Sequence, residues 1–363
     1  MLFRSVAGAG EMSQTAGLTT GRVIIIGAGL GALYAALELA PRPVLVISPE
    51  VLGVGASSAW AQGGVAAAMA SNDCAEAHAL DTMRAGAGTV DAAVARMVTG
   101  EARRHILDLT SLGTPFDRDA QGDYVMSREA AHGIARVVRV KGDQAGREIM
   151  QSLIVAVRAE ACARAGIDPV HQAIPVVAAA HYHMGGVATG TDGRASLRGL
   201  WVCGEAASTG LHGANRLASN GLLEALVYAR ICAREIRAAT PDLADQPEVA
   251  LVFPAGGEVT DAAAVARLRQ LMTDHVGVLR DAAGLRLALA GIAAIEAGAA
   301  SDTLRNMTAT ATLIAAAALL REESRGAHFR TDFPQSNPAL AQRSHLTLAR
   351  ALEIRCLAQS ELT

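Results

Sequence analysis

A β-branched run followed by a glycine-rich turn constrains the fold of this chain more than any other feature. Residues 22–26 (RVIII) have the composition of a buried parallel strand, and the pattern Gly-x-Gly-x-x-Ala follows directly. Residues 33–40 are expected to form a helix that Pro41 ends, and residues 44–47 (VLVI) a second buried strand. This βαβ unit predicts a dinucleotide whose pyrophosphate lies at a helix N-terminus, against the turn residues Gly27, Ala28, Gly29, Leu30 and Gly31.

The end of the second strand separates two classes of dinucleotide. Nicotinamide-binding units usually have an acid at this place, where it binds the ribose hydroxyls. Here the place holds Ser48, with Glu50 just beyond. A serine can still bind a ribose, so the pattern weakens a nicotinamide interpretation more than a flavin one.

Composition excludes several other classes of protein. The chain of 363 residues is 51% apolar and 18% charged, which is typical of a globular protein of about two to three domains. A net charge of -3 without a basic run disfavours nucleic acid. Five cysteines without a C-x-x-C pair argue against a disulfide framework or a zinc site and fit a reducing cytosol. The longest uncharged apolar run, residues 307–320, is shorter than the roughly 20 residues of a membrane span.

Two polar segments are candidates for the rest of the site. Residues 57–64 (SSAWAQGG) offer small side chains and backbone N–H groups, although an ordinary polar loop has the same composition. In the second segment, Arg216 can clamp a carboxylate, and a helix begins near Ser219 or Asn220, either of which can cap it. The N-terminus of that helix can stabilise the charge of a reduced flavin. His181 and His212 can bind a carboxylate or another ligand, but a single histidine of this kind is more often structural, and no metal site is supported.

Together these segments resemble the L-aspartate oxidases, within the succinate dehydrogenase/fumarate reductase flavoprotein family. The resemblance rests on VIIIGAGLGAL (23–33), SSAWAQGG (57–64), SREAAHG (127–133), GDQAGREI (142–149), AAAHYHMGGV (178–187), LWVCGEAASTGLHGANRLASNGLLEALV (200–227) and REESRGAHFRTDFP (321–334). These motifs occur in the order of the family and extend over nearly the whole chain.

The resemblance implies an α/β fold, with a Rossmann-like FAD-binding domain and a C-terminal α-helical bundle domain. It implies FAD as cofactor, oxidation of L-aspartate to iminoaspartate with O₂ or fumarate as acceptor, a place at the start of NAD biosynthesis in the cytoplasm, and functional coupling to quinolinate synthase. Ser57 stands where relatives with covalent FAD have a histidine, which implies noncovalent FAD. The substrate contacts implied are Glu129, His181 and Arg216. The FAD contacts implied are Gly27, Ala28, Gly29, Leu30, Gly31, Ser48, Ser57, Ser58, Ala61, Gln62, Gly63, Gly64, Glu205, Ser219, Asn220, Gly221 and Leu222.

The chain also departs from the family. The capping domain, its H-P-T motif and its proton-transferring arginine in P-R-D are missing, which predicts a large internal deletion near residues 158–161 and an incomplete FAD-binding domain. Ala130-Ala131 replaces a usual Gly-Gly, and Gly221 a usual Ser. The expected organisation is a tail (1–21, with Met12 a candidate start), two parts of the FAD-binding domain (22–158 and 159–238), a linker (239–260) and a helical domain (261–363). A noncatalytic remnant and a succinate- or fumarate-type flavoprotein remain alternatives.

Overall fold

A computed structural model describes residues 22–42, 44–48, 57–141, 144–158, 182–240 and 259–361. The chain divides into two compact units, and the described residues of the first lie between 22 and 240, those of the second between 259 and 361. The expected tail, most of the linker, and all but the first residue of the expected junction at 158–161 lie outside the described residues.

The predicted βαβ unit is present at the start of the first unit. Strands β1 (Val23–Ile26) and β2 (Val44–Ile47) are parallel, with Val23 opposite Val44. Helix α1 (Leu30–Leu39) begins at Leu30, earlier than predicted, because the extended backbone of Gly29 already serves as its N-cap. Gly27 has φ +108° and donates its N–H to Ile47 O at 2.8 Å, a conformation that favours glycine. The glycine turn therefore leads directly into the helix N-terminus.

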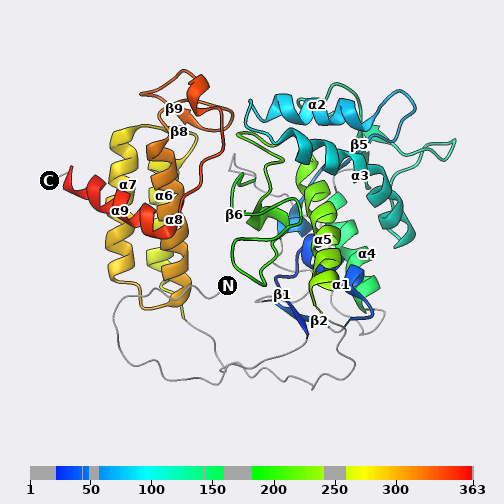
Figure 1. Ribbon diagram of the computed structural model, residues 1–363, viewed down its shortest axis with the longest axis horizontal. Coiled ribbons are helices and arrows are strands. Elements are labelled where there is room, and N and C mark those ends of the chain that lie inside the picture. Colours follow the sequence, from blue (N-terminus) through cyan, green and yellow to red (C-terminus); the bar gives the residue numbers. More distant parts are fainter. Residues whose placement is uncertain are drawn as a thin grey trace, which may run out of the picture. The chain divides into compact units, whose positions relative to one another are not determined.

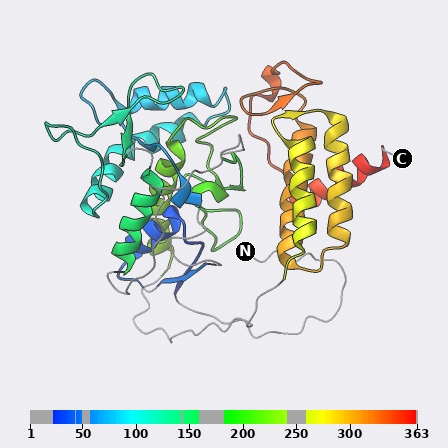
Figure 2. The same cartoon turned by 180° about the vertical axis from the view of Figure 1, so that it is seen from behind.

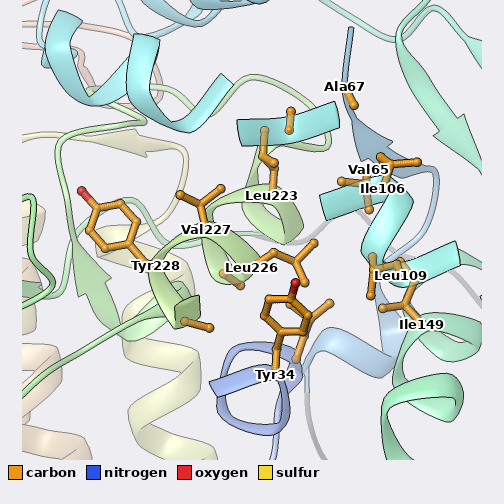
Figure 3. Packing of buried hydrophobic residues seen from close by; sticks show 14 of the residues in the cluster. Tyr34, Val65, Ala67, Ile106, Leu109, Ile149, Leu223, Leu226, Val227 and Tyr228 are labelled. Carbon is orange, nitrogen blue, oxygen red and sulfur yellow. The ribbon is translucent and has the colours of Figure 1, made fainter. Parts of the chain in front are cut away.

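The rest of the first unit surrounds one long helix, α5 (Asn220–Ala239), which packs against α1 and α3 (Figure 1). Figure 3 shows side chains of α5, such as Leu223 and Leu226, among those of α1, α3 and α4 in the buried core. The remaining elements are η1 (Ser57–Trp60), β3 (Gly64–Ala66), α2 (Ala75–Ala85), α3 (Ala92–Ser111), β4 (Met126–Ser127), β5 (Val137–Arg139), α4 (Ala145–Arg158), β6 (Val187–Ala188), η2 (Gly204–Ala206) and β7 (Ala207–Ser208).

Two further small sheets lie among the described residues of this unit. Strands β3, β5 and β4 form an antiparallel sheet in that order, and β6 pairs with β7 in parallel. The apolar run at residues 200–203 (LWVC) predicts a short strand, but this prediction is wrong, because Trp201 forms only an isolated bridge with Arg194. Gly199 (φ +80°) and Gly204 (φ +71°) turn the chain on either side and leave too short an extended run.

Strand β1 is more exposed than its sequence predicts. Ile24 and Ile26 are 49% and 65% exposed, although a β-branched run of this kind is typical of a strand covered on both faces. Among the described residues, β1 pairs only with β2. The sheet of the expected FAD-binding domain is therefore represented here by two strands with apolar side chains at the surface.

The described residues of the second unit form a bundle of helices. Helices α6 (Ala262–Val276), α7 (Ala282–Ala297) and α8 (Asp302–Leu320) lie side by side, and α9 (Leu348–Ser360) runs across them (Figures 1 and 2). Side chains of Asp261, Asp281, Ser301 and Thr347 accept backbone N–H groups at the four helix starts. The short elements of this unit are β8 (Leu279–Arg280), β9 (Phe329–Arg330) and η3 (Pro338–Leu340).

Helix α8 is the one described helix that is long and apolar enough to cross a membrane, by length and composition alone. It contacts α6, α7 and α9, and its Ala315 and Ala316 are fully buried in the core of the bundle. A core helix of this kind has the same composition as a membrane span.

Candidate functional site

The first part of the site lies at the N-terminus of α1. Leu30 donates its backbone N–H to Ser58 Oγ at 3.1 Å, and a Cβ atom at Gly29 would lie 3.3 Å from the same oxygen. Gly146, the second residue of α4, donates its N–H to Ala61 O at 2.9 Å, and a Cβ there would lie 2.1 Å from Ser58 O. The glycines of two motifs thus let the SSAWAQGG segment lie close to the turn that is expected to hold a pyrophosphate.

The second part of the site joins three segments at the start of α5. Ser219 Oγ donates a hydrogen bond to Glu129 Oε2 at 3.0 Å, and a Cβ at Gly63 would lie only 2.6 Å from Glu129 Oε1. Residues 57–64 therefore run from the N-terminus of α1, contacted by Ser58, to that of α5, where Gly63 adjoins Glu129. The structure brings together segments that the sequence shows only as separate motifs.

The predicted capping of α5 by Ser219 or Asn220 is wrong. Ser219 is at the N-cap position, but its φ of +62° and its bond to Glu129 direct the hydroxyl away from the helix, and no side chain caps it. The amide of Asn220 instead accepts from His78 Nε2 at 2.8 Å and donates to Thr82 Oγ1 at 2.9 Å. The first N–H groups of α5 thus have no side-chain cap, and the positive end of the helix dipole faces the site.

Two buried histidines contact the residues at the start of α5. His78 binds Asn220, His132 Nε2 lies 2.9 Å from Ala218 O, and the two rings are 5.9 Å apart between centroids. Burial lowers the pKa of His78 to about 4 and lowers that of His132. Both rings are therefore neutral near pH 7 and can each donate from Nε2.

A fully buried ion pair supports the same region. Arg136 donates to Asp73 at 2.9 Å and to Asp81 at 2.6 Å, and Asp81 also accepts from Gly133 N at 2.7 Å. Burial opposes the charge of Arg136, but these two carboxylates raise its pKa. Sequence reasoning missed this network, although an arginine among apolar residues (IARVVRV) is a signal for a buried pair.

A buried carboxylate lies within the next turn of α5. Glu224 is 1% exposed and accepts from Tyr182 Oη at 3.0 Å, Thr209 Oγ1 at 2.5 Å and His212 Nε2 at 2.9 Å. His212 thus binds a carboxylate, as considered from the sequence, but that of Glu224 in this chain. Sequence reasoning missed Tyr182 and Thr209, which no local pattern connects to Glu224.

Arg216 lies beside this cluster and is half-buried. Its guanidinium carbon is 4.9 Å from the centroid of the Tyr182 ring, and its Nη1 donates to Leu217 O at 3.3 Å. Burial lowers the pKa of Arg216, and the carboxylates of Glu129, Glu205 and Glu224 oppose that effect. Nε of Arg216 is buried without a hydrogen-bond partner within the described part of the chain. A desolvated guanidinium with a free N–H fits an anionic ligand.

The other predicted site residues fall into three groups. His181 and the side chain of Ser57 lie outside the described residues, while Ser48 directly follows β2. Glu205, in η2, accepts from His183 N at 3.1 Å. The rest lie on or beside the elements already described: Ala28 in the turn before α1, Gly31 in the first turn of α1, Gln62 between η1 and β3, Gly64 at the start of β3, and Gly221 and Leu222 in the first turn of α5.

The loop from Arg128 to Gly133 lines a shallow depression of about 520 Å³ beside Glu129. Ala131 in this loop has φ +66°, a left-handed conformation that favours glycine and costs an alanine roughly 1 kcal/mol. The Gly-to-Ala departure noted in the sequence therefore falls at a position where the backbone requires what glycine supplies. No group of acids, histidines or cysteines in the described ranges could hold a metal ion.

Comparison with known proteins identifies the family. Residues 22–162 and 154–222 match the family described as FAD binding domain, and residues 299–353 match the fumarate reductase flavoprotein C-terminal family. In fold, the chain is similar to Sdh1 of Mycobacterium smegmatis, solved in complex with UQ1, with a TM-score of 0.73 and 19% identity over 94% of this chain and 97% of that one. Quinol fumarate reductase of E. coli is similar at a TM-score of 0.70 and 17% identity over 88% and 92% of the two chains.

Sequence relatives narrow the assignment. The chain is 33% identical to the L-aspartate oxidase of Caulobacter vibrioides, over 90% of this chain and 96% of that protein. That alignment has 497 positions, more than the 363 residues of this chain. Identity to the L-aspartate oxidase of Rhodospirillum rubrum is 53%, over 51% of this chain and 67% of the relative. The chain belongs to the L-aspartate oxidase family of FAD-dependent oxidoreductases, within the succinate dehydrogenase/fumarate reductase flavoproteins.

Proposed function

We propose that this chain binds FAD noncovalently and oxidises L-aspartate to iminoaspartate, with O₂ or fumarate as electron acceptor. The observation that carries the proposal is the arrangement at the start of α5, where Glu129 is bound to Ser219 and Arg216 keeps an unpaired Nε. An amino dicarboxylate needs a carboxylate that pairs with its ammonium group and a cationic or donor group for each of its two carboxylates. This arrangement supplies the carboxylate, Glu129, and one of the two cationic groups, Arg216. We further propose action in the cytoplasm at the first step of NAD biosynthesis, with functional coupling to quinolinate synthase, which would take up the product.

The described residues fit FAD. At the turn before α1, Gly27 (φ +108°) has nothing within 4 Å of a Cβ position, and the helix N-terminus is free of acidic side chains. We assign the pyrophosphate to Gly27–Gly31 and Ser58, and the ribose to Ser48. The flavin is assigned to residues 61–64, Glu205 and the uncapped start of α5, residues 219–222.

The residues of the chain then have distinct roles toward the substrate. Arg216 binds one carboxylate through two N–H groups, Glu129 pairs with the ammonium group, and His181 is assigned to the second carboxylate. The chemistry that FAD supplies when bound is acceptance of the hydride from the substrate Cα. The uncapped N–H groups of α5 favour negative charge at the flavin position, so the chain stabilises the reduced cofactor.

The test is reduction of bound flavin by L-aspartate without oxygen. The purified chain is loaded with FAD, and the visible absorbance is followed for several hours after L-aspartate is added, with D-aspartate and succinate as controls. Bleaching by L-aspartate alone supports the proposal whatever the rate. Bleaching by succinate instead would identify a succinate-type flavoprotein and overturn the proposal. Glu129 and Ser57 argue against a succinate-type flavoprotein.

A second candidate function is binding of FAD and dicarboxylate without turnover. The exposure of Ile24 and Ile26 on β1 favours it, because it is the result expected if strands of the FAD-binding domain are missing. The family match also splits into two pieces that meet at residues 154–162, where we propose the internal deletion and the loss of the capping domain. A spectral shift with L-aspartate but no bleaching would support this candidate over the first.

A further inference from the structure

One buried acid near the site, Glu224, has no role in the chemistry proposed above. Glu224 accepts three hydrogen bonds, from Tyr182, Thr209 and His212, and is 1% exposed. Burying a carboxylate is costly unless donors satisfy it. Three donors do so here, which makes Glu224 a fixed anchor at the centre of the cluster.

Tyr182 connects this anchor to Arg216. Its hydroxyl donates to Glu224, and its ring lies 4.9 Å from the Arg216 guanidinium carbon and 5.1 Å from the His212 ring, edge to face. Burial and the neighbouring Glu224 carboxylate raise the pKa of the Tyr182 phenol, so the hydroxyl stays protonated and keeps donating. One face of Tyr182 is thus available to the cation while its hydroxyl is held in place.

Arg216 has few other restraints among the described residues. Its one hydrogen bond is the 3.3 Å contact of Nη1 with Leu217 O, and its Nε has no partner. Among the described residues, the ring of Tyr182 is the aromatic surface that this guanidinium lies over and that can hold its orientation. A bidentate bond to a carboxylate forms at lower entropic cost when that guanidinium is already oriented before the ligand arrives.

We infer that Glu224 is a positioning residue for Arg216, acting through the hydroxyl and ring of Tyr182. The inference rests on the proposed function, in which Arg216 binds a substrate carboxylate. It assigns to Glu224 a specific effect on the carboxylate clamp, in addition to its contribution to packing.

The experiment measures the chemical accessibility of Arg216 directly. The FAD-loaded chain is treated with phenylglyoxal, and the rate of Arg216 modification is followed by peptide mass spectrometry in Glu224→Gln, Tyr182→Phe and the double variant. Each single variant is expected to raise the rate about 5-fold, and the double variant no further, because both changes break the same connection. Tyr34→Phe is the matched control, since Tyr34 also lies under an arginine, Arg230, and beside a carboxylate, Asp108.

The outcomes separate this inference from the function on which it rests. Arg216 rates that match the wild type in both single variants, or rise equally in Tyr34→Phe, would overturn the inference, as would additive effects in the double variant. Protection of Arg216 by succinate is measured in the same samples. If the variants change the rate but succinate protects no form, the positioning role stands and the proposed role of Arg216 fails.

Discussion

Ser219 and Glu129 are 90 residues apart in sequence, yet the serine hydroxyl donates a hydrogen bond to the glutamate carboxylate at 3.0 Å. The bond fixes Oε2 of Glu129 and leaves Oε1 beside Gly63, where a Cβ would come within 2.6 Å. The position of the carboxylate is therefore set by the residue that begins α5 and by a glycine of the SSAWAQGG segment. This makes Glu129 a group whose charge can be tested with little change of shape.

The first prediction is that Glu129→Gln weakens binding of L-aspartate more than binding of succinate. The substitution keeps the shape and can still bind Ser219, but it removes the charge that pairs with an ammonium group, which succinate lacks. We expect a loss of about 10-fold or more for L-aspartate and less than about 3-fold for succinate. The measurement is the dissociation constant of each ligand from the perturbation of the bound FAD spectrum.

The control for this prediction is Glu38→Gln. Glu38 pairs with Arg230 at 2.6 Å on the far part of α1, away from the turn. Glu38→Gln should change neither the dissociation constant of L-aspartate nor that of succinate. Equal losses for both ligands in Glu129→Gln would remove the amino-selecting role.

The second prediction concerns Arg216→Lys. Lysine keeps the charge but loses the planar pair of donors and the stacking on Tyr182, so dicarboxylate binding should weaken by about 2–4 kcal/mol. L-aspartate and succinate should lose about equally, in contrast to Glu129→Gln. Arg194→Lys is the matched control, because Arg194 also lies over an aromatic ring, that of Trp201 at 5.3 Å. Unchanged succinate affinity in Arg216→Lys would remove Arg216 from the site.

The third prediction is that FAD is released by acid. Ser57 has no ring nitrogen that could form the covalent bond to the flavin that a histidine forms in some relatives. Precipitation of the FAD-loaded chain with trichloroacetic acid should leave the yellow colour in the supernatant. A pellet that keeps the colour after washing in denaturant would show a covalent link at another residue.

The sequence predicted the elements that depend on local pattern. The βαβ unit and the helical character of the C-terminal part both follow from apolar patterning and turn residues. It did not predict how Ser219 and Asn220 are used, because both match the pattern of a helix cap. Contacts with Glu129 and His78 override that preference, and such contacts between distant segments leave no local signal.

The buried polar groups near the start of α5 also have partners that the sequence alone does not predict. His78, Arg136 and Glu224 stand in the sequence as ordinary residues of helices and strands, and only their burial reveals that they must be paired. The resemblance to a family directed attention to Arg216 and Glu129, but the residues that hold them come from the structure. Tyr182 is the clearest example, since its partner Glu224 is 42 residues away.

The fourth prediction is that the free energy of unfolding falls at acid pH, in part because of His78. Burial lowers its pKa to about 4 in the folded chain, against roughly 6.5 when unfolded. The unfolded state therefore takes up the proton first, and stability is lost as the pH falls from about 6.5 to about 4. His78→Gln can still donate to Asn220 but does not titrate, so it should remove on the order of 2–3 kcal/mol of that loss.

Urea unfolding between pH 7.5 and pH 4 measures this effect. His105, whose pKa burial lowers to about 3, and His132 should leave a remaining slope in the His78→Gln variant. Parallel curves for the wild type and the variant would show that His78 is not the titrating group.

The last prediction is that the chain of 363 residues releases hydrogen peroxide from L-aspartate far more slowly than a relative that carries the capping domain. The family resemblance implies that the cap contributes the proton-transferring arginine, and loss of such a group typically costs 10²–10⁴-fold. Exposure of Ile24 and Ile26 adds apolar surface at β1, which should also weaken retention of FAD. We therefore expect a rate at least about 100-fold below that of the relative, measured with excess FAD and equal protein. Insertion of the relative's intervening segment near residue 158 should restore turnover. Peroxide formation by the unmodified chain at an ordinary enzyme rate of about 1–10³ s⁻¹ would show that its own residues complete the site.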